Sequence, residues 1–257
     1  MQFATIAGRR LEYRVIPGDS ARAALVFLHE GLGCAALWRD FPDRVAARLG
    51  ARSLVYSRLG YGHSDALGGA RAPTFMHEEA LTILPQLMDR TGFHNALLLG
   101  HSDGASIALI HAALAGRPVA GLALLAPHVF VEPICLASIA KIRDSYRVSA
   151  ADPDGLRSRL AKYHVHVDDA FLGWADAWLQ PEFRGWNIEA LAAAVTAPLL
   201  LIQGTDDEYG TLAQLDSITR RATGPVSRLI LPDCGHAPQR DCEGAVLDAI
   251  VAFAQGL

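Results

Sequence analysis

The sequence has little net charge and no long apolar run. Its 27 acidic and 23 basic side chains give a formal charge of −4, which lacks the basic surplus that nucleic-acid binding requires. Lysine occurs only at Lys141 and Lys162, a bias that we attribute to base composition. No apolar run approaches the roughly 20 residues that span a bilayer. We therefore expect neither nucleic acid nor a membrane as a partner.

Cysteine is scarce as well. Cys34, Cys135, Cys234 and Cys242 lack the spacing of metal ligands, so no metal site is expected. The first residues have neither the basic nor the apolar segment of a secretory signal. These absences predict a protein of the reducing cytoplasm. The choice between a monomer and a homodimer stays open, because no exposed apolar stripe stands out from the core pattern.

The chain does contain enough apolar material for one large domain. Of its 257 residues, 51% are hydrophobic and 19% are charged, as in globular proteins. A hairpin at 3–6 and 10–16 opens the chain. Further strands are expected at 25–28, 53–56, 97–99, 119–126, 198–203 and 227–231, with helices at 36–49, 74–90 (capped by Thr74), 212–222 and 243–254. This alternation predicts a doubly wound α/β domain with a parallel sheet covered on both faces.

The alternation breaks between residues 127 and 194. This stretch has no strand-like run but carries helical segments divided by prolines and a glycine. We predict that 127–194 forms a cap of about four short helices, inserted into a core domain made of 1–126 and 195–257. The segment contains Trp174, Trp178 and Trp186. We expect at least two of these tryptophans to serve core packing, although such residues can also line an apolar pocket.

The clearest motif is a Gly-x-Ser-x-Gly at residues 100–104. The short pattern also occurs by chance in loops, but here it lies between a strand-like and a helix-like run. This context indicates a sharp strand–turn–helix with the Ser102 hydroxyl exposed above the sheet. Such a turn is strained and has no room for side chains two residues before and after the serine. Gly100 and Gly104 meet this requirement. The positive end of the following helix then faces any negative charge that develops at the serine.

Together with three further motifs, this one makes the chain resemble the α/β-hydrolase superfamily over essentially its whole length. The others are a glycine loop at 29–33, an acid after a late strand at Asp207, and a histidine in Gly-His-Ala-Pro at 235–238. The order Ser, Asp, His is the order of this fold. The resemblance implies a mostly parallel eight-stranded sheet, a helical cap and a catalytic triad of Ser102, Asp207 and His236.

The chemistry of these residue types agrees with a triad. A serine hydroxyl needs a base within hydrogen-bond reach, and the imidazole of His236 can take its proton and return it to the leaving group. A buried carboxylate that accepts the other imidazole N–H orients this base. The resemblance assigns that carboxylate to Asp207, with the turn residue Asp206 as its rival. His101, beside the nucleophile, is expected to pack against the sheet.

The resemblance also implies an oxyanion hole made of the backbone N–H groups of Gly31 and Asp103. Two departures from the family pattern accompany it. Glu30 stands where glycine is usual, and the loop after the fourth strand reads Ser-Arg-Leu-Gly at 57–60 in place of Asp-x-Arg-Gly. We hypothesise that Glu30 and Arg58 form an ion pair that braces the two loops. The alternative is that both charges point to solvent.

These features predict a serine hydrolase that cleaves a small or medium-sized ester-like bond through an acyl-enzyme. No metal or organic cofactor is implied. On the same fold, the alternatives are a carbon–carbon bond hydrolase, a thioesterase and a perhydrolase, and His101 in Gly-His-Ser favours esterases and perhydrolases over carbon–carbon bond hydrolases. A different class of function is a ligand sensor that keeps the triad without turnover. A lyase that uses the triad as acid and base is a third reading.

Overall fold

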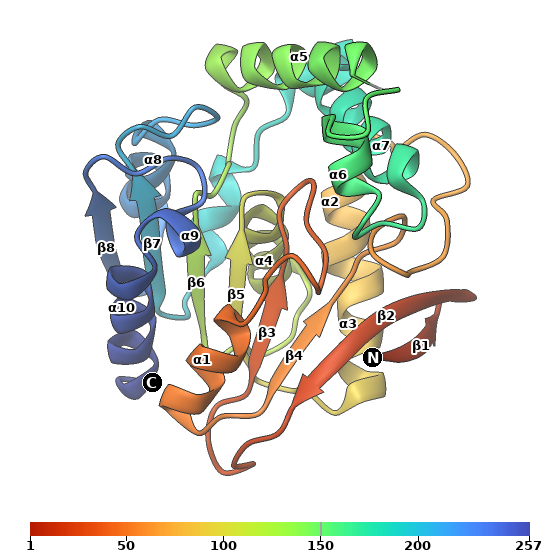
Figure 1. Ribbon diagram of the computed structural model, residues 1–257. Coiled ribbons are helices and arrows are strands. Elements are labelled where there is room, and N and C mark those ends of the chain that lie inside the picture. Colours follow the sequence, from red (N-terminus) through yellow and green to blue (C-terminus); the bar gives the residue numbers. More distant parts are fainter. Residues whose placement is uncertain (150) are drawn as a thin grey trace.

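A single eight-stranded sheet forms the centre of the molecule (Figure 1). The computed structural model describes residues 1–149 and 151–257. The strands are β1 (Gln2–Ile6), β2 (Arg9–Ile16), β3 (Leu25–Leu28), β4 (Ser53–Tyr56), β5 (Leu97–His101), β6 (Gly121–Leu125), β7 (Leu199–Gly204) and β8 (Val226–Leu231). Their spatial order is β1-β2-β4-β3-β5-β6-β7-β8. Only the pairings of β1 with β2 and of β2 with β4 are antiparallel, which confirms the predicted mostly parallel sheet.

The sheet separates two apolar cores. On β3, Val26 and Leu28 pack into one core, whereas Leu25 and Phe27 pack into the other. This alternation makes a parallel strand apolar on both faces, as its continuous apolar run indicated. The first core is covered by α3 (Leu84–Thr91), α4 (Asp103–Leu114) and α8 (Ala213–Arg221), and the second by α1 (Phe41–Leu49) and α10 (Glu243–Gln255).

Helix α4 runs through the interior. Every residue from Asp103 to His111 is buried, and a helix that is surrounded in this way has no polar face. It packs on β5 and β6 and also contacts the helical stretch over residues 75–91. That stretch comprises α2 (Phe75–Glu78), a π-helical turn at Glu79–Ile83 and α3, and it ends at Gly92 in a left-handed conformation with φ of 73°.

Two local predictions are wrong. The helix predicted from residue 36 begins at Phe41. Residues 36–40 form turns instead, because Arg39 adopts φ of 53°, a left-handed conformation that interrupts a helix. Thr74 does precede the next helix, but its side chain makes no capping hydrogen bond.

The segment between β6 and β7 is helical. It contains α5 (Pro133–Val148), α6 (Leu156–Leu160), α7 (Val167–Leu179) and two short 3₁₀ helices, η2 (Pro181–Gly185) and η3 (Glu189–Ala194). Figure 1 shows α5, α6 and α7 above the ends toward which the parallel strands point. By contrast, η3 packs beside the sheet against α4 and α8. The division of the chain into a core and a cap at 127 and 194 stays a prediction.

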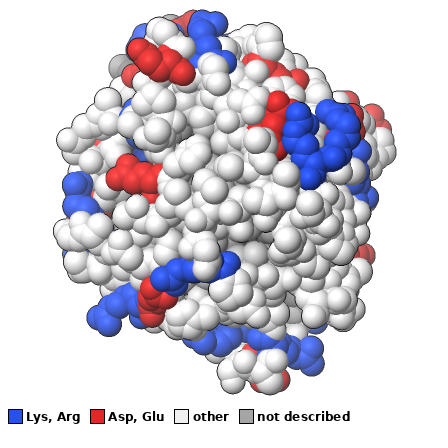
Figure 2. Space-filling view, turned by 180° about the vertical axis from the view of Figure 1, so that it is seen from behind, with Lys and Arg blue, Asp and Glu red and all other residues white. Residues whose placement is uncertain are grey.

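Figure 2 shows charged side chains of both signs on this face of the molecule. They form small clusters, in several of which acidic and basic side chains lie next to one another, separated by neutral residues. None of the helices described here combines the length and the apolar character needed to cross a bilayer.

We predict that Leu109→Ala lowers the free energy of unfolding by about 3 kcal/mol, because it leaves a cavity inside the packed core. Leu109 is fully buried in α4, whereas Leu114 in the last turn of the same helix is 48% exposed. Leu114→Ala is the matched control, with an expected loss below about 1 kcal/mol. Urea unfolding measures both values, and similar losses would contradict the buried position of α4.

Candidate active site

Ser102 lies at the apex of a sharp turn between β5 and α4. Its backbone has φ of 53° and ψ of −119°, and its N–H donates to the carbonyl of Leu125 at 2.9 Å. A Cβ atom at Gly100 would lie 2.4 Å from the carbonyl oxygen of Gly104, and one at Gly104 would lie 2.0 Å from that of Leu28. Both positions therefore require glycine, because the backbone of α4 approaches that of β5 and β3 too closely for a side chain, as the motif predicted.

The structure brings His236 between Ser102 and Asp207. His236 lies on the loop that joins β8 to the short helix α9 (Pro238–Asp241). The hydroxyl of Ser102 donates to Nε2 of His236 at 2.9 Å. The opposite nitrogen, Nδ1, donates to the two carboxylate oxygens of Asp207 at 2.8 and 2.9 Å. Asp206 is exposed and accepts a hydrogen bond from Thr205 instead.

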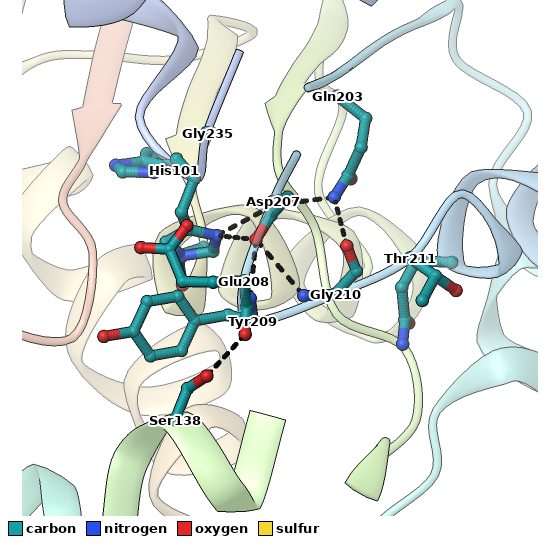
Figure 3. A network of polar contacts seen from close by, with 12 residues as sticks. His101, Ser138, Gln203, Asp207, Glu208, Tyr209, Gly210, Thr211 and Gly235 are labelled. Atoms are coloured by element: carbon teal, nitrogen blue, oxygen red, sulfur yellow. Dashed lines mark hydrogen bonds and ion pairs between the residues drawn. The ribbon is translucent and has the colours of Figure 1, made fainter. Parts of the chain in front are cut away.

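Besides His236, three donors hold the carboxylate of Asp207: two N–H groups of its own loop and a side-chain amide of β7 (Figure 3). Oδ1 accepts from the N–H groups of Tyr209 at 2.8 Å and Gly210 at 3.2 Å. Oδ2 accepts from Nε2 of Gln203 at 2.7 Å, and the same amide donates to the carbonyl of Gly210 at 3.0 Å. Burial acts to raise the pKa of Asp207, but the hydrogen bond and charge of His236 and the Tyr209 N–H outweigh it, so the pKa is lowered.

His101 supports the backbone of His236. It is 2% exposed, and its Nε2 donates to the carbonyl oxygen of His236 at 2.7 Å. Nδ1 lies 3.1 Å from the side-chain amide of Gln239 and 3.5 Å from a carboxylate oxygen of Glu30. His101 is therefore buried at the end of β5, and it also positions the loop that carries His236. Sequence analysis missed this second role, because nothing local to residue 101 indicates contact with residue 236.

The N–H groups expected to form the oxyanion hole belong to the loop after β3 and to the first turn of α4. Gly31 and Asp103 line the same cavity as Ser102, and Asp103 is the first residue of α4. Among the described residues, neither N–H is taken up by a backbone hydrogen bond. Neither amide thus has a competing backbone acceptor in the described part of the chain, as an oxyanion hole requires, and their assignment to that role stays a prediction.

The predicted ion pair between Glu30 and Arg58 is wrong. Arg58 pairs instead with Asp103, with 3.7 Å between Nη2 and Oδ2, and it donates to the backbone carbonyl of Glu30 at 2.9 Å. The carboxylate of Glu30 faces His101. Burial acts to raise the pKa of Glu30, but the hydrogen bond and the charge of His101 lower it well below its usual range. The loops are braced, but through a carbonyl group.

A cavity of about 560 Å³ opens above Ser102. Polar groups line it around Ser102 and His236, the charged side chains of Glu30, Glu208, Arg240 and Asp241 line another part, and the remaining lining is apolar. The apolar lining residues are Leu32, Leu37, Cys135, Ile139, Ile142, Leu156, Leu160, Trp174 and Trp178. Trp174 and Trp178 line the cavity but are also buried in the first apolar core, and Trp186 stacks on Phe183, so the expected core packing of at least two tryptophans is confirmed. No cluster of three or more His, Cys, Asp or Glu side chains in the described ranges could hold a metal ion.

His128 is a buried cavity residue that sequence analysis did not identify. It follows β6, and its ring centre lies 5.7 Å from that of His236 and 5.3 Å from that of Trp178. Its Nδ1 is buried and has no hydrogen-bond partner among the described residues. Burial, assisted by the charge of His236, lowers the pKa of His128 to about 3. The only signal in the sequence is its place after a parallel strand, where ligands of such sheets bind.

We predict that His128 makes the fold less stable in acid. An unfolded histidine has a pKa of about 6.5, so between pH 6.5 and 3 the unfolded chain binds more protons than the native one. The contribution of His128 to the free energy of unfolding therefore falls by about 2 kcal/mol when the pH is lowered from 7 to 5. Urea titrations at the two pH values should show this loss reduced in His128→Gln. His94→Gln, at a side chain that is 63% exposed, is the control, and an equal effect there would refute the prediction.

Comparisons with known proteins agree with this geometry. Residues 23–173 match the model of the alpha/beta hydrolase fold family. The proline iminopeptidase of Lactobacillus delbrueckii subsp. lactis is 28% identical over 98 residues, which cover 38% of this chain and 33% of that protein. The chain thus matches about a third of the length of that curated relative.

Two solved structures resemble the chain over nearly all of its length. The enol-lactonase from Burkholderia xenovorans has a TM-score of 0.74 at 19% identity, over 99% of this chain and 100% of that one. An esterase from Exiguobacterium antarcticum has a TM-score of 0.76 at 17% identity, over 98% of each chain. These likenesses concern the fold, and the matched family model covers more than half of the sequence. The predicted family is confirmed: the chain belongs to the α/β-hydrolase fold family.

Proposed function

We propose that the protein is a serine hydrolase that cleaves a small or medium-sized carboxylic ester through an acyl-enzyme at Ser102. The observation that carries this proposal is the continuous hydrogen-bonded chain from Ser102 Oγ through His236 to Asp207, with steps of 2.9 and 2.8 Å. A nucleophile, a base and an orienting acid within hydrogen-bond reach are the arrangement that acyl transfer requires.

Acylation follows from the donor and acceptor roles in this chain. Nε2 of His236 takes the hydroxyl proton while Oγ of Ser102 attacks the ester carbonyl carbon. The carbonyl oxygen gains a negative charge, which the N–H groups of Gly31 and Asp103 bind. Asp207 stabilises the imidazolium. His236 then gives its proton to the leaving alkoxide, so that an alcohol departs and the acyl group stays on Ser102.

Deacylation uses the same groups in reverse. A water molecule takes the place of the alcohol, and His236 removes its proton as the water oxygen attacks the acyl carbon. The second tetrahedral intermediate occupies the same pair of N–H groups. Its collapse returns the proton through His236 to Ser102 and releases a carboxylic acid. The low pKa of Asp207 supports this cycle, because the carboxylate stays ionised beside the imidazolium.

The cavity walls favour an apolar acyl or alcohol group. Ile139 and Ile142 of α5, Leu156 and Leu160 of α6, and Trp174 of α7 all come from the segment 127–194. We therefore assign that segment the role of a cap that shapes the pocket above the nucleophile. A substrate of small or medium size suits a cavity of about 560 Å³.

A second candidate is the release of an amino-terminal residue from a peptide. The sequence match to a proline iminopeptidase favours it, and the ionised carboxylate of Glu30 in the cavity wall offers a partner for an ammonium group. A sensor that binds a ligand without turnover would use the same cavity. Product release distinguishes these functions.

The first test is labelling by a fluorophosphonate probe, followed by intact-mass analysis and assays with p-nitrophenyl esters of graded chain length and with prolyl-p-nitroanilide. We expect one adduct, lost in Ser102→Ala. Asp207→Asn should lower kcat about 10⁴-fold because the imidazole loses its orienting acceptor. Asp206→Asn is the matched control at the neighbouring carboxylate and should stay within about twofold of the wild type.

Each outcome has a definite meaning. Faster turnover of the nitroanilide than of every ester would replace the esterase proposal by the peptidase. An adduct that persists in Ser102→Ala would contradict the assigned nucleophile. Stoichiometric binding of the esters without release of product would favour the sensor.

A further inference from the structure

Arg58 is a buried cation beside the candidate active site to which the mechanism above assigns no role. It lies on the loop after β4, and its side chain is 2% exposed. Burying a guanidinium is unfavourable unless the charge is paired and hydrogen-bonded. The partners of Arg58 therefore indicate what its position achieves.

One nitrogen of Arg58 contacts both segments that carry the expected oxyanion donors, the loop after β3 and the first turn of α4. Nη2 donates to the carbonyl oxygen of Glu30 at 2.9 Å, and it lies 3.7 Å from Oδ2 of Asp103. Glu30 directly precedes Gly31, which carries the first N–H, and Asp103 carries the second. The longer distance makes the contact with Asp103 an ion pair that acts mainly through charge.

The hydrogen bond to Glu30 fixes the direction of the Gly31 N–H. The peptide unit that joins these residues is planar and trans, so its carbonyl oxygen and its N–H point in opposite directions. The same oxygen also accepts hydrogen bonds from Nδ1 of His29 at 2.7 Å and from the backbone N–H of Gly33 at 3.1 Å, and Nε2 of His29 accepts from the backbone N–H of Arg58 at 3.1 Å. Arg58 supplies the charged donor of this set, and charge-assisted hydrogen bonds are the stronger ones. Because glycine is conformationally free, loss of that donor would loosen the orientation of the Gly31 peptide.

Arg58 also compensates a buried negative charge next to the nucleophile. The side chain of Asp103 is fully buried, and its Oδ1 accepts a hydrogen bond of 3.1 Å from Nε1 of Trp178. An unpaired carboxylate one residue after Ser102 would repel the negative charge that forms on the substrate carbonyl. The guanidinium of Arg58, which is not among the residues that line the cavity, offsets this repulsion.

We propose that Arg58 is the positioning residue of the oxyanion site: it orients the Gly31 N–H through the Glu30 carbonyl and compensates the carboxylate of Asp103. Arg58 does not touch the substrate and acts only through these two residues. This inference rests on the proposed serine hydrolase function and deepens it.

The test compares Arg58→Met with Arg71→Met in the complete protein. Arg71 is a matched control, because the two guanidinium groups lie at similar distances from the centre of the Tyr61 ring, 4.8 Å for Arg71 and 5.1 Å for Arg58. Arg71 differs in its acceptor, since it donates to the carbonyl of Leu59. With p-nitrophenyl butyrate, Arg58→Met should lower kcat about 10- to 100-fold, with KM within about twofold of the wild type. Arg71→Met should change kcat about twofold or less.

A transition-state probe separates this role from a general loss of structure. A trifluoromethyl ketone adds to the serine and forms an oxyanion, so Arg58→Met should weaken its inhibition by about the same factor as kcat. Binding of butyramide, a neutral amide whose carbonyl oxygen carries no such charge, should stay within about twofold. Arg58→Lys keeps the positive charge, but a single ammonium does not replace the planar guanidinium, and its kcat should still fall about tenfold.

Circular dichroism and thermal melting establish that each variant is folded. If Arg58→Met is unfolded, kcat and ketone inhibition of Arg58→Lys test the inference instead. Wild-type kcat and ketone affinity in a folded Arg58 variant would overturn the inference, and so would an equal loss in Arg71→Met. Absence of a fluorophosphonate adduct in the wild type would instead overturn the proposed function itself.

Discussion

The left-handed backbone of Ser102 is the constraint on which the rest of the site depends. This conformation costs a serine roughly 1–2 kcal/mol, so the surroundings must impose it. They do so through the close approach of β5 and α4 at Gly100 and Gly104 and through the hydrogen bond from Ser102 to Leu125. The expected nucleophile, the N–H of Asp103 and the N-terminus of α4 thereby become parts of one rigid unit.

Much of the fold followed from patterns that can be read locally in the sequence. Apolar runs such as 97–99 predicted the central strands, because a strand buried on both faces cannot alternate. The two small residues around Ser102 predicted the sharp turn. The order of motifs then grouped Ser102 with Asp207 and His236, which the structure brings within hydrogen-bond reach. These inferences succeeded because each depends on neighbours in the chain or on a recurring order.

Contacts between distant segments could not be predicted in this way. Arg58 contacts Asp103 and the carbonyl of Glu30 because the segments that follow the neighbouring strands β4, β5 and β3 meet at one edge of the sheet, and neither partner is marked by spacing. Sequence reasoning paired the two obvious opposite charges and overlooked a backbone acceptor. The start of α1 was missed for a similar reason, since the left-handed conformation of Arg39 comes from its surroundings and not from its residue type.

The position of β7 and β8 at one edge of the sheet has a consequence for biosynthesis. His236 follows Ser102 by 134 residues and lies beyond the last strand to be made. Because chains emerge from the ribosome amino terminus first, the turn at Ser102 can form on β3, β5 and β6 well before the imidazole is available. A nascent chain therefore holds Ser102 with no imidazole beside it, and the docking of β8 is the event that brings His236 within hydrogen-bond reach of the hydroxyl.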